Sequence, residues 1–498
     1  GRPLQEFEHH QCARRIRRIR AVRIHDLAHV GAIDLAAQAE QLAVDLEVRV
    51  RPEGEKPHEH GDAEDQRDPG EPESTAIRPQ QPCDVGMVRF AHESHVTVVF
   101  MSFDVHELRQ RFPSIRQTSD LFFDGPAGTQ VPESVVEAVS RGLVEAASNV
   151  GGAFAASHRS DAVVEAARTA AADFVGGSPD EIVFGPNMTT LTMAFSRAVL
   201  AAYEPGDRIV VSAIDHDANV STWTRAASDF GIDVDWIELA DEHVQLDLDS
   251  LEKVLTDRTR LIAIAGASNA FGTLTDLKRV ARLAADSGAK VFVDAVHLAP
   301  HERIDVRALG VDAVVCSGYK FYGPHVGVLW AKRAWLDDIH PYKVRPAPAD
   351  APGKFETGTP SFALLAGLTA AIDHLASLGQ GATRAERLDA AFADIRSHEA
   401  ALGRRFLSQL PENVTVWGMP SMEGRVPTFA VGIEGRTPSE VADLPAREGM
   451  CVWAGHYYAV EPMRRLGLLD SGGLTRIGFV NTTTDSEVDR LLEALAAL

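Results

Sequence analysis

The sequence predicts an α/β fold in which helices cover both faces of a mostly parallel β-sheet. Two observations support this prediction. Short, continuous apolar segments alternate along the chain with longer segments of helical periodicity, as is typical of strands that are buried on both faces. Several of these strands are followed directly by polar side chains, at the edge where open α/β sheets bind their ligands.

The elements of the predicted sheet follow one another in a regular order. Strands and helices are expected to alternate as strand 181–184, helix 189–202, strand 208–212, helix 221–229, strand 261–265, helix 276–287, and strands 290–294 and 313–316. The pattern changes after about residue 341. A Pro/Ala loop at 345–353 precedes helices 362–378 and 383–410 and strands 414–416, 428–432 and 476–480. This second pattern predicts a smaller α+β domain.

The chain is expected to have four parts. Residues 1–100 are predicted to be disordered, with one possible helix at 27–50, because residues 51–82 contain almost no large apolar side chain. They also fit an over-extended reading frame, since Met101 begins a segment that resembles an ordinary enzyme N-terminus. The other parts are an N-terminal helical segment (101–120), a large domain (121–345) and a small C-terminal domain (346–498).

Composition narrows the classes of function. The net charge of −22 disfavours nucleic-acid binding and adhesion to anionic membranes. No apolar run approaches the roughly 20 residues of a membrane span. The 4 cysteines include no CxxC pair, which favours a reducing compartment, and no Cys/His spacing matches a closed zinc site. We therefore expect a cytoplasmic enzyme without a bound metal.

Five predicted strands end in side chains with chemical functions. After the strands come the segment 185–190, His216, Asn269, the pair Asp294 and His297, and Lys320. Segment 185–190 opens a helix whose free N–H groups would bind a phosphate, although no Walker or GxGxxG motif is present. Desolvation would make Lys320 nucleophilic toward an aldehyde, and Asp294 would pair with a pyridine nitrogen. These are the requirements of pyridoxal 5′-phosphate (PLP).

Eight motifs, in order, carry a resemblance to a known family. They are LFFDGPAGTQVP (121–132), FGPNMTTLT (184–192), DHDAN (215–219), SNAFGTL (268–274), VDAVHLAPH (293–301), SGYKFYGPHVGVL (317–329), ETGTPSF (356–362) and WAGHYY (453–458). Residues 121–498 thus resemble the cysteine desulfurase-like branch of the class V aminotransferases, which are fold-type I PLP enzymes. The resemblance implies an aspartate aminotransferase-like fold, with a seven-stranded-type sheet in the large domain.

The resemblance also implies a role for individual residues. Lys320 would form the Schiff base and move the Cα proton, Asp294 would pair with the pyridine nitrogen, and His216 would stack on the cofactor ring. Asn269 and His297 would flank the phenolic oxygen. The phosphate would be bound by Met188 (through its backbone), Thr189, Ser317 and Tyr319, and by Thr359 of a neighbouring subunit, so a homodimer is expected. Arg476 would bind the substrate carboxylate, and Tyr458 would lie at the substrate.

The sequence departs from the desulfurases at the residues expected to take up sulfur. Tyr458 stands at the position of their nucleophilic Cys, and Trp453 replaces an Arg of the family. The leading hypothesis is therefore a PLP-dependent transferase or lyase that acts on a small amino acid. A cysteine or selenocysteine desulfurase that uses Cys451 is the second hypothesis. A transaminase, an epimerase or a lyase of the same fold, and a catalytically quiet PLP-binding partner protein, remain open.

Two interpretations without this cofactor also fit parts of the pattern. Asp294 and His216, taken singly, fit structural polar residues at strand ends. Ser317 and Lys320 match the SxxK spacing of serine acyl-enzymes, but the SDN and KTG partners of that motif are absent. The interval between Asp294 and Lys320, about one strand–helix–strand unit, favours the PLP interpretation.

Overall fold

The computed structural model describes residues 104–240 and 243–498. All elements below lie in the compact unit formed by residues 103–498. The predictions made for residues 1–100, including the helix at 27–50, lie outside the described residues.

The described chain begins with two short helices, α3 (Val105–Arg109) and α4 (Pro113–Gln117). The Asp104 carboxylate caps α3 by accepting two backbone N–H groups at 3.1 Å. Between the helices, Phe112 is fully buried and meets the ring of Tyr322 edge-on, with 5.9 Å between centroids. The helical segment is thereby packed against the turn that follows Lys320.

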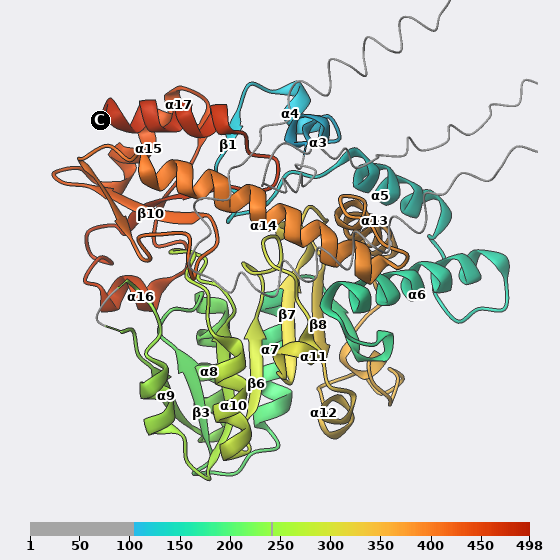
Figure 1. Ribbon diagram of the computed structural model, residues 1–498. Coiled ribbons are helices and arrows are strands. Elements are labelled where there is room, and N and C mark those ends of the chain that lie inside the picture. Colours follow the sequence, from blue (N-terminus) through green and yellow to red (C-terminus); the bar gives the residue numbers. More distant parts are fainter. Residues whose placement is uncertain (1–103, 241–242) are drawn as a thin grey trace, which may run out of the picture. The chain divides into compact units, whose positions relative to one another are not determined.

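The large sheet has seven strands in the order β2-β8-β7-β6-β5-β3-β4 (Figure 1). The strands are β2 (Ile182–Gly185), β3 (Arg208–Ser212), β4 (Asp233–Ile237), β5 (Thr259–Ala265), β6 (Lys290–Asp294), β7 (Ala313–Ser317) and β8 (Gly327–Ala331). Strand β8 is antiparallel to both of its neighbours, β7 and β2, and the other neighbouring pairs are parallel. Six of the seven strands therefore run in the same direction.

The sequence patterns missed two of these strands and shifted some bounds. Strand β4 alternates polar and apolar residues at the sheet edge, so it lacks the continuous apolar run that marked the others. Strand β8 begins within the motif that contains Lys320 (317–329), so its apolar residues do not stand out as a separate strand in the sequence. Glu181 was expected to begin a strand but ends the 3-10 turn Pro179–Glu181, where it forms a capping box with Ser178.

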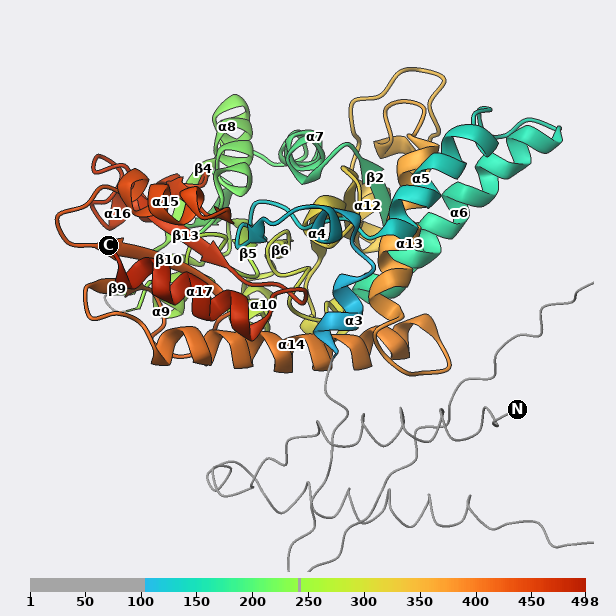
Figure 2. The same cartoon turned by 90° about the horizontal axis from the view of Figure 1, so that it is seen from above.

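Both faces of the sheet are buried, as the apolar runs predict. Along β3, Ile209 and Val211 point to one core cluster and Val210 to the other, and all three are fully buried. Figure 2 shows α7 and α8 on one side of the sheet and α10 on the other. The covering helices are α6 (Ala155–Val175), α7 (Met188–Leu200), α8 (Ser221–Phe230), α10 (Leu277–Ser287) and α13 (Phe362–Ala376).

A second, antiparallel sheet of order β12-β13-β10-β9 is built from the C-terminal part of the chain. Its strands are β9 (Val414–Trp417), β10 (Thr428–Ile433), β12 (Trp453–Gly455) and β13 (Leu474–Gly478). The strand expected at 476–480 thus begins and ends two residues earlier. The rings of Phe406, Phe429 and Phe479 form its core, with centroids 4.7–5.5 Å apart.

The first of the eight motifs, which begins at Leu121, packs into the core of this C-terminal sheet. Strand β1 (Leu121–Phe122) pairs in parallel with β11 (Met450–Cys451), and Leu121 and Phe123 are buried beside Phe406. The domain boundaries at 120, 345 and 346 remain a prediction. The other helices are α5 (Glu133–Glu145), α9 (Leu248–Val254), α11 (Val306–Leu309), α12 (Arg333–Asp338), α14 (Arg384–Ser408), α15 (Pro438–Arg447), α16 (Val460–Arg465) and α17 (Asp485–Ala496).

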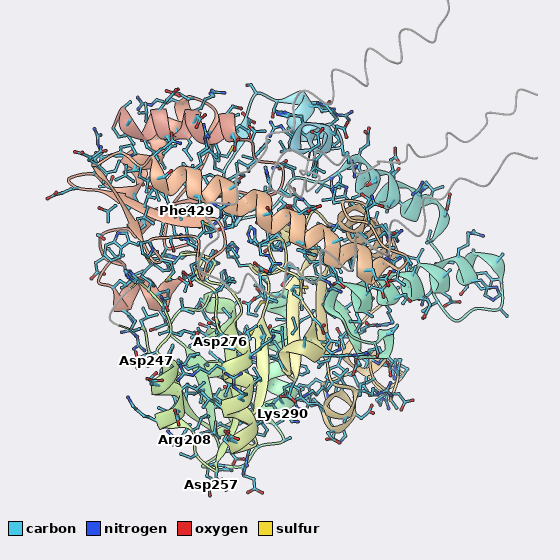
Figure 3. The ribbon with its side chains drawn as sticks, in the orientation of Figure 1. Arg208, Asp247, Asp257, Asp276, Lys290 and Phe429 are labelled. Atoms are coloured by element: carbon cyan, nitrogen blue, oxygen red, sulfur yellow. The ribbon has the colours of Figure 1, made fainter. Side chains whose placement is uncertain are left out.

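The orientation of the large sheet decides where the strand-end residues lie. Figure 3 labels Arg208 and Asp257, near the amino ends of β3 and β5, at the end of the sheet away from Phe429 in the C-terminal sheet. The carboxyl ends of the parallel strands therefore face the C-terminal sheet. None of the helices among the described residues is long and apolar enough to cross a membrane.

Candidate active site

The five strands that end in functional side chains share one edge of the large sheet. Strands β3, β5, β6 and β7 are parallel, and β2 has the same direction because two antiparallel pairings through β8 connect it to β7. In the sheet, β8 lies between β2 and β7, so these five ends are not all neighbours. The side chains that follow them nevertheless converge.

Lys320 ends a 3-10 turn, Gly318–Lys320, that begins directly after β7. A Cβ at Gly318 would lie 2.6 Å from the carbonyl oxygen of Pro324, so the tight turn requires glycine there. The Lys320 ammonium donates a hydrogen bond to the Pro126 carbonyl. Burial, together with the charge of Arg476, lowers the pKa of Lys320 to about 7, against the opposing effect of Asp294. A large fraction of the amine is therefore uncharged near neutral pH.

Asp294 is the last residue of β6 and is 4% exposed. One carboxylate oxygen accepts the Val296 N–H at 2.9 Å. Burial raises the pKa of Asp294 to about 6, although the Lys320 charge acts in the opposite direction. A buried carboxyl group that feels the charge of a nearby amine suits pairing with a protonated ring nitrogen.

A second carboxyl group, Asp215, is fully buried and close enough to Asp294 to feel its charge, and the sequence assigned it no role. It hydrogen-bonds to the Ser212 hydroxyl, to the Asn219 amide at 2.6 Å and to the Ala265 N–H at 2.9 Å. Burial and, to a smaller extent, the charge of Asp294 raise its pKa to about 7. The DHDAN motif contains this residue, but only the tertiary structure shows that its carboxylate links β3, through Ser212, to β5, through Ala265.

His216 follows Asp215 and begins the 3-10 turn Asp217–Asn219. Its Nδ1 accepts the Ala218 N–H at 3.0 Å. The imidazole lies nearly parallel to the ring of Tyr458, with 5.4 Å between centroids and 20° between planes. Burial and the charges of Lys320 and Arg476 lower the pKa of His216 to about 4, which keeps a flat, neutral ring available for stacking.

Asn269 and His297, the two residues expected at the phenolic oxygen, are held by different partners. The Asn269 amide donates to the Tyr457 carbonyl at 2.9 Å, and its Oδ1 has no hydrogen-bond partner among the described residues. The His297 Nε2 lies 3.0 Å from the Thr428 hydroxyl. Burial lowers the pKa of His297 well below its usual value.

Three of the residues expected at the phosphate, Met188, Thr189 and Ser317, meet at the first turn of α7. The Met188 N–H donates to the Ser317 hydroxyl at 2.9 Å, which links α7 to the end of β7. Thr189 is exposed at the same turn, so it is open to a ligand. Tyr319 stacks on His325, with 4.7 Å between centroids and 14° between planes. A helix N-terminus with exposed donors suits a phosphate group.

Arg476 reaches the site from the central part of the C-terminal sheet and is 5% exposed. It donates to the Asn269 carbonyl at 3.0 Å, and its guanidinium lies 4.6 Å from the Tyr457 ring centroid. Burial lowers its pKa to about 10. No carboxylate in the described part of the chain forms an ion pair with this buried cation, which suits a substrate carboxylate.

Three residues that the sequence pointed to lie at the edge of this group of side chains or outside it. Thr359 is exposed in the loop before α13. Tyr458 is 66% exposed and meets the site through the ring of His216 and through its backbone. Cys451 lies on β11, where its backbone pairs with Phe122, and burial together with Asp124 raises the pKa of its thiol.

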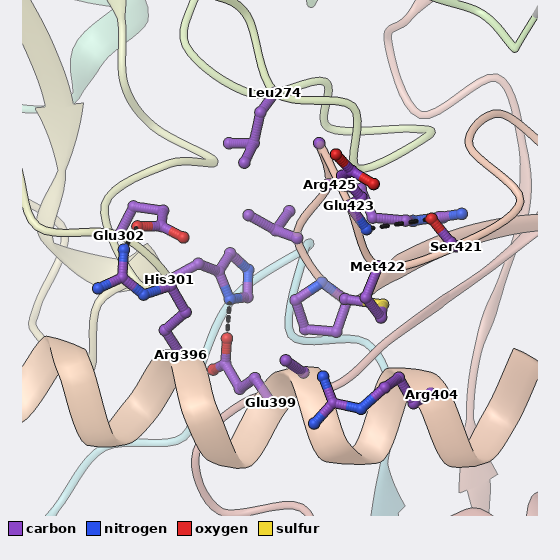
Figure 4. Close-up of a pocket in the computed structure, with 14 residues that line it drawn as sticks. Leu274, His301, Glu302, Arg396, Glu399, Arg404, Ser421, Met422, Glu423 and Arg425 are labelled. Atoms are coloured by element: carbon purple, nitrogen blue, oxygen red, sulfur yellow. Dashed lines mark hydrogen bonds and ion pairs between the residues drawn. The ribbon is translucent and has the colours of Figure 1, made fainter. Parts of the chain in front are cut away.

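A cavity of about 540 Å³ borders the site without containing any of its predicted residues (Figure 4). It lies between α14 and the loop 419–427, and His301 and Glu399 form a buried pair in its wall, with 2.8 Å between Nδ1 and Oε2. The His301 ring meets that of His297 edge-on at 5.2 Å. We place the site at the strand ends because the titratable groups converge there. No cluster of metal-binding side chains occurs within residues 104–240 and 243–498.

The comparisons agree with this geometry. The model of the family described as "Aminotransferase class-V" matches residues 121–491. The uncharacterized protein MT3887 of Mycobacterium tuberculosis is 32% identical over 80% of this chain and 100% of its own length. A cysteine desulfurase of Synechococcus elongatus is 31% identical over 80% of this chain and 63% of its own length. The apo structure of a cysteine desulfurase from Thermococcus onnurineus NA1 superposes with a TM-score of 0.73 at 26% identity, covering 80% of this chain and 98% of that one.

Proposed function

Because the chain belongs to the class V aminotransferase family, as a cysteine desulfurase-like member, we propose that it binds PLP at the strand-end site and transforms an amino acid there. Enzymes of this family are PLP-dependent in general. The fold agrees with the fold-type I architecture that the sequence predicted.

One observation carries the proposal. Asp294 ends β6 and Lys320 follows the adjacent strand β7, and the buried carboxyl group and the half-buried amine have pKa values near neutrality, about 6 and about 7. An uncharged amine beside a buried carboxyl group is what an aldehyde cofactor with a basic ring nitrogen requires. The unpartnered Oδ1 of Asn269, within the described residues, and the exposed first turn of α7 support the same fit.

Each residue then has a physical task. The bound cofactor supplies an aldehyde that reacts with amines and a ring that withdraws electrons from the substrate Cα. Lys320 would attach the cofactor through its amine and move the proton at the substrate Cα, and Asp294 would keep a proton at the ring nitrogen. His216 covers the ring face, and Arg476 binds the substrate carboxylate. The phosphate group would be held by Met188 through its backbone and by the side chains of Thr189, Ser317 and Tyr319.

The exposure of Thr359 supports the predicted homodimer. This residue is exposed in the single chain and lies in the loop before α13, outside the phosphate-binding turn of α7. A second copy would have to bring this residue to its partner's site. The single chain is then incomplete at the phosphate group.

The structure disfavours a persulfide at Cys451. The raised thiol pKa lowers the fraction of the nucleophilic thiolate, and the strand pairing of β11 with β1 holds the residue in place. We therefore favour a reaction that needs no cysteine nucleophile, with elimination, transamination and epimerisation distinguished by their products.

The test is cofactor attachment. Protein mixed with PLP is expected to gain a visible absorption band, and borohydride should fix the cofactor on Lys320, as located by peptide mass spectrometry. Lys320→Ala should lose both signals. Lys253→Ala, a change of an exposed lysine on α9, serves as the matched control and should keep them. An unchanged band in Lys320→Ala, or no band in the unaltered protein, would sink the proposal.

A further inference from the structure

We propose that Trp453 and Tyr458 select a substrate whose side chain is planar or apolar. The inference rests on the proposed function and specifies the kind of substrate side chain, which the proposed function leaves open. It replaces the small side chain that the sequence predicted with a larger one.

Trp453 lies beside the group expected to bind the substrate carboxylate. On the antiparallel strands β12 and β13 it is directly opposite Arg476. Residues in this arrangement project from the same face, with roughly 5 Å between their Cβ atoms. Burial raises the pKa of Asp124, and the nearby Trp453 indole and the Lys320 charge both oppose this rise, so the indole lies close to the same carboxyl group as Lys320. A carboxylate bound by Arg476 therefore brings the substrate Cα, and the side chain on it, next to the indole.

The two rings offer apolar surface to an incoming ligand. Trp453 is 53% exposed and Tyr458 is 66% exposed, although they lie beside the half-buried residues Asp124 and His216 of the site. An aromatic or aliphatic substrate side chain would cover this surface and remove it from water. Aromatic pairs gain further from offset or edge-on contact. A methyl or thiol side chain would leave most of both rings in solvent.

The backbone holds the Tyr458 ring at the site despite an unfavourable conformation. Tyr457 and Tyr458 have φ values of 51° and 59°, in the left-handed region that bulky residues rarely adopt. Their carbonyls accept hydrogen bonds from the Asn269 amide at 2.9 Å and from the Asp217 N–H at 2.7 Å. Such strain persists where surrounding contacts impose it, and it is typical of ligand sites. The Asn269 side chain and the Asp217 backbone thus hold the backbone of Tyr457 and Tyr458 beside the site.

The experiment titrates the PLP-loaded protein with L-phenylalanine, L-alanine and L-cysteine and follows the cofactor spectrum. We expect phenylalanine to bind about tenfold more tightly than alanine or cysteine, a difference equivalent to about 1.4 kcal/mol. In Trp453→Ala and Tyr458→Ala the ratio of dissociation constants should fall toward one. Trp453→Phe and Tyr458→Phe keep a flat ring and should restore the preference.

The outcomes separate this inference from the proposed function. Equal or tighter binding of alanine or cysteine, or a preference for phenylalanine that survives both alanine variants, would overturn the selection by these rings while the PLP function stands. A protein that gains no borohydride-sensitive band with PLP would instead overturn the proposed function. Only variants whose absorption band shows that they are folded and loaded with PLP are compared by their dissociation constants.

Discussion

The two halves of the candidate site are built in different ways. On the cofactor half, Asp294 ends β6, and Asn269 and Lys320 closely follow β5 and β7. All three strands are buried on both faces and paired on both sides. On the substrate half, Arg476 comes from the smaller sheet, and the rings of Trp453 and Tyr458 come from an exposed segment that includes left-handed backbone. The large sheet holds the residues of the cofactor half in place. Residues of the substrate half lie outside that sheet, so they can be substituted without disturbing it.

The largest expected effect concerns the rigid half. Asp294→Asn removes the charge that would hold a proton at the cofactor ring, so the rate of amino-acid-dependent spectral change should fall about a hundredfold. Stopped-flow absorption of the PLP-loaded variant measures this rate. Asp229→Asn, an exposed change on α8, should leave the rate unaltered.

The same variant should be more stable when the cofactor is absent. The pKa of Asp294 is raised from 3.8 to about 6, so between pH 4 and 6 the folded protein keeps a proton that the unfolded chain loses. Stability therefore falls as the pH rises through this window, and the neutral amide of the Asp294→Asn variant avoids this loss. At pH 7 the free energy of unfolding should rise by roughly 1–3 kcal/mol in urea titrations. A variant that loses both stability and reactivity would contradict a functional origin of the buried charge.

A third prediction tests how the substrate half acts on the cofactor half. The rate of covalent PLP attachment to the cofactor-free protein should rise with pH and level off above about pH 7, where Lys320 is deprotonated. An ordinary lysine would give a rate that increases up to its usual pKa of 10.5. Arg476→Gln removes a cation that lowers the pKa of Lys320, so the midpoint should move upward by about one pH unit. A midpoint that stays in place or moves downward would mean that the two halves are not coupled through charge.

The smallest expected effect concerns the strained segment. Tyr458→Gly should be more stable than Tyr458→Ala by about 1 kcal/mol, because glycine adopts a φ of 59° without a Cβ penalty. Urea denaturation of the two variants gives the difference. Ala401→Gly, at an exposed position of α14, should show the opposite sign, since glycine destabilises a regular helix. Equal stability of the two Tyr458 variants would show that the segment carries no strain.

The sequence alone predicted the strand-end half of the site. Continuous apolar runs identify strands buried on both faces, and the residue after each run must lie at a sheet edge, so Asp294 and Lys320 could be placed together from local patterns. The same patterns missed β8, although it gives β2 its direction, because no connecting helix separates it from the Lys320 motif. Thr359 carried a predicted role, but its exposure follows from the folded chain.

The tertiary structure alone decided how charges and rings are distributed around these side chains. Strand register and contacts between residues distant in sequence decide whether Arg476 meets an anion and whether Trp453 lies opposite it. They also decide whether Asp215 is buried within reach of the charge of Asp294. Local composition determines which residue types follow a strand, because a strand needs apolar side chains only along its length. Burial and pKa depend on every neighbouring segment, and the packing of the two sheets sets them.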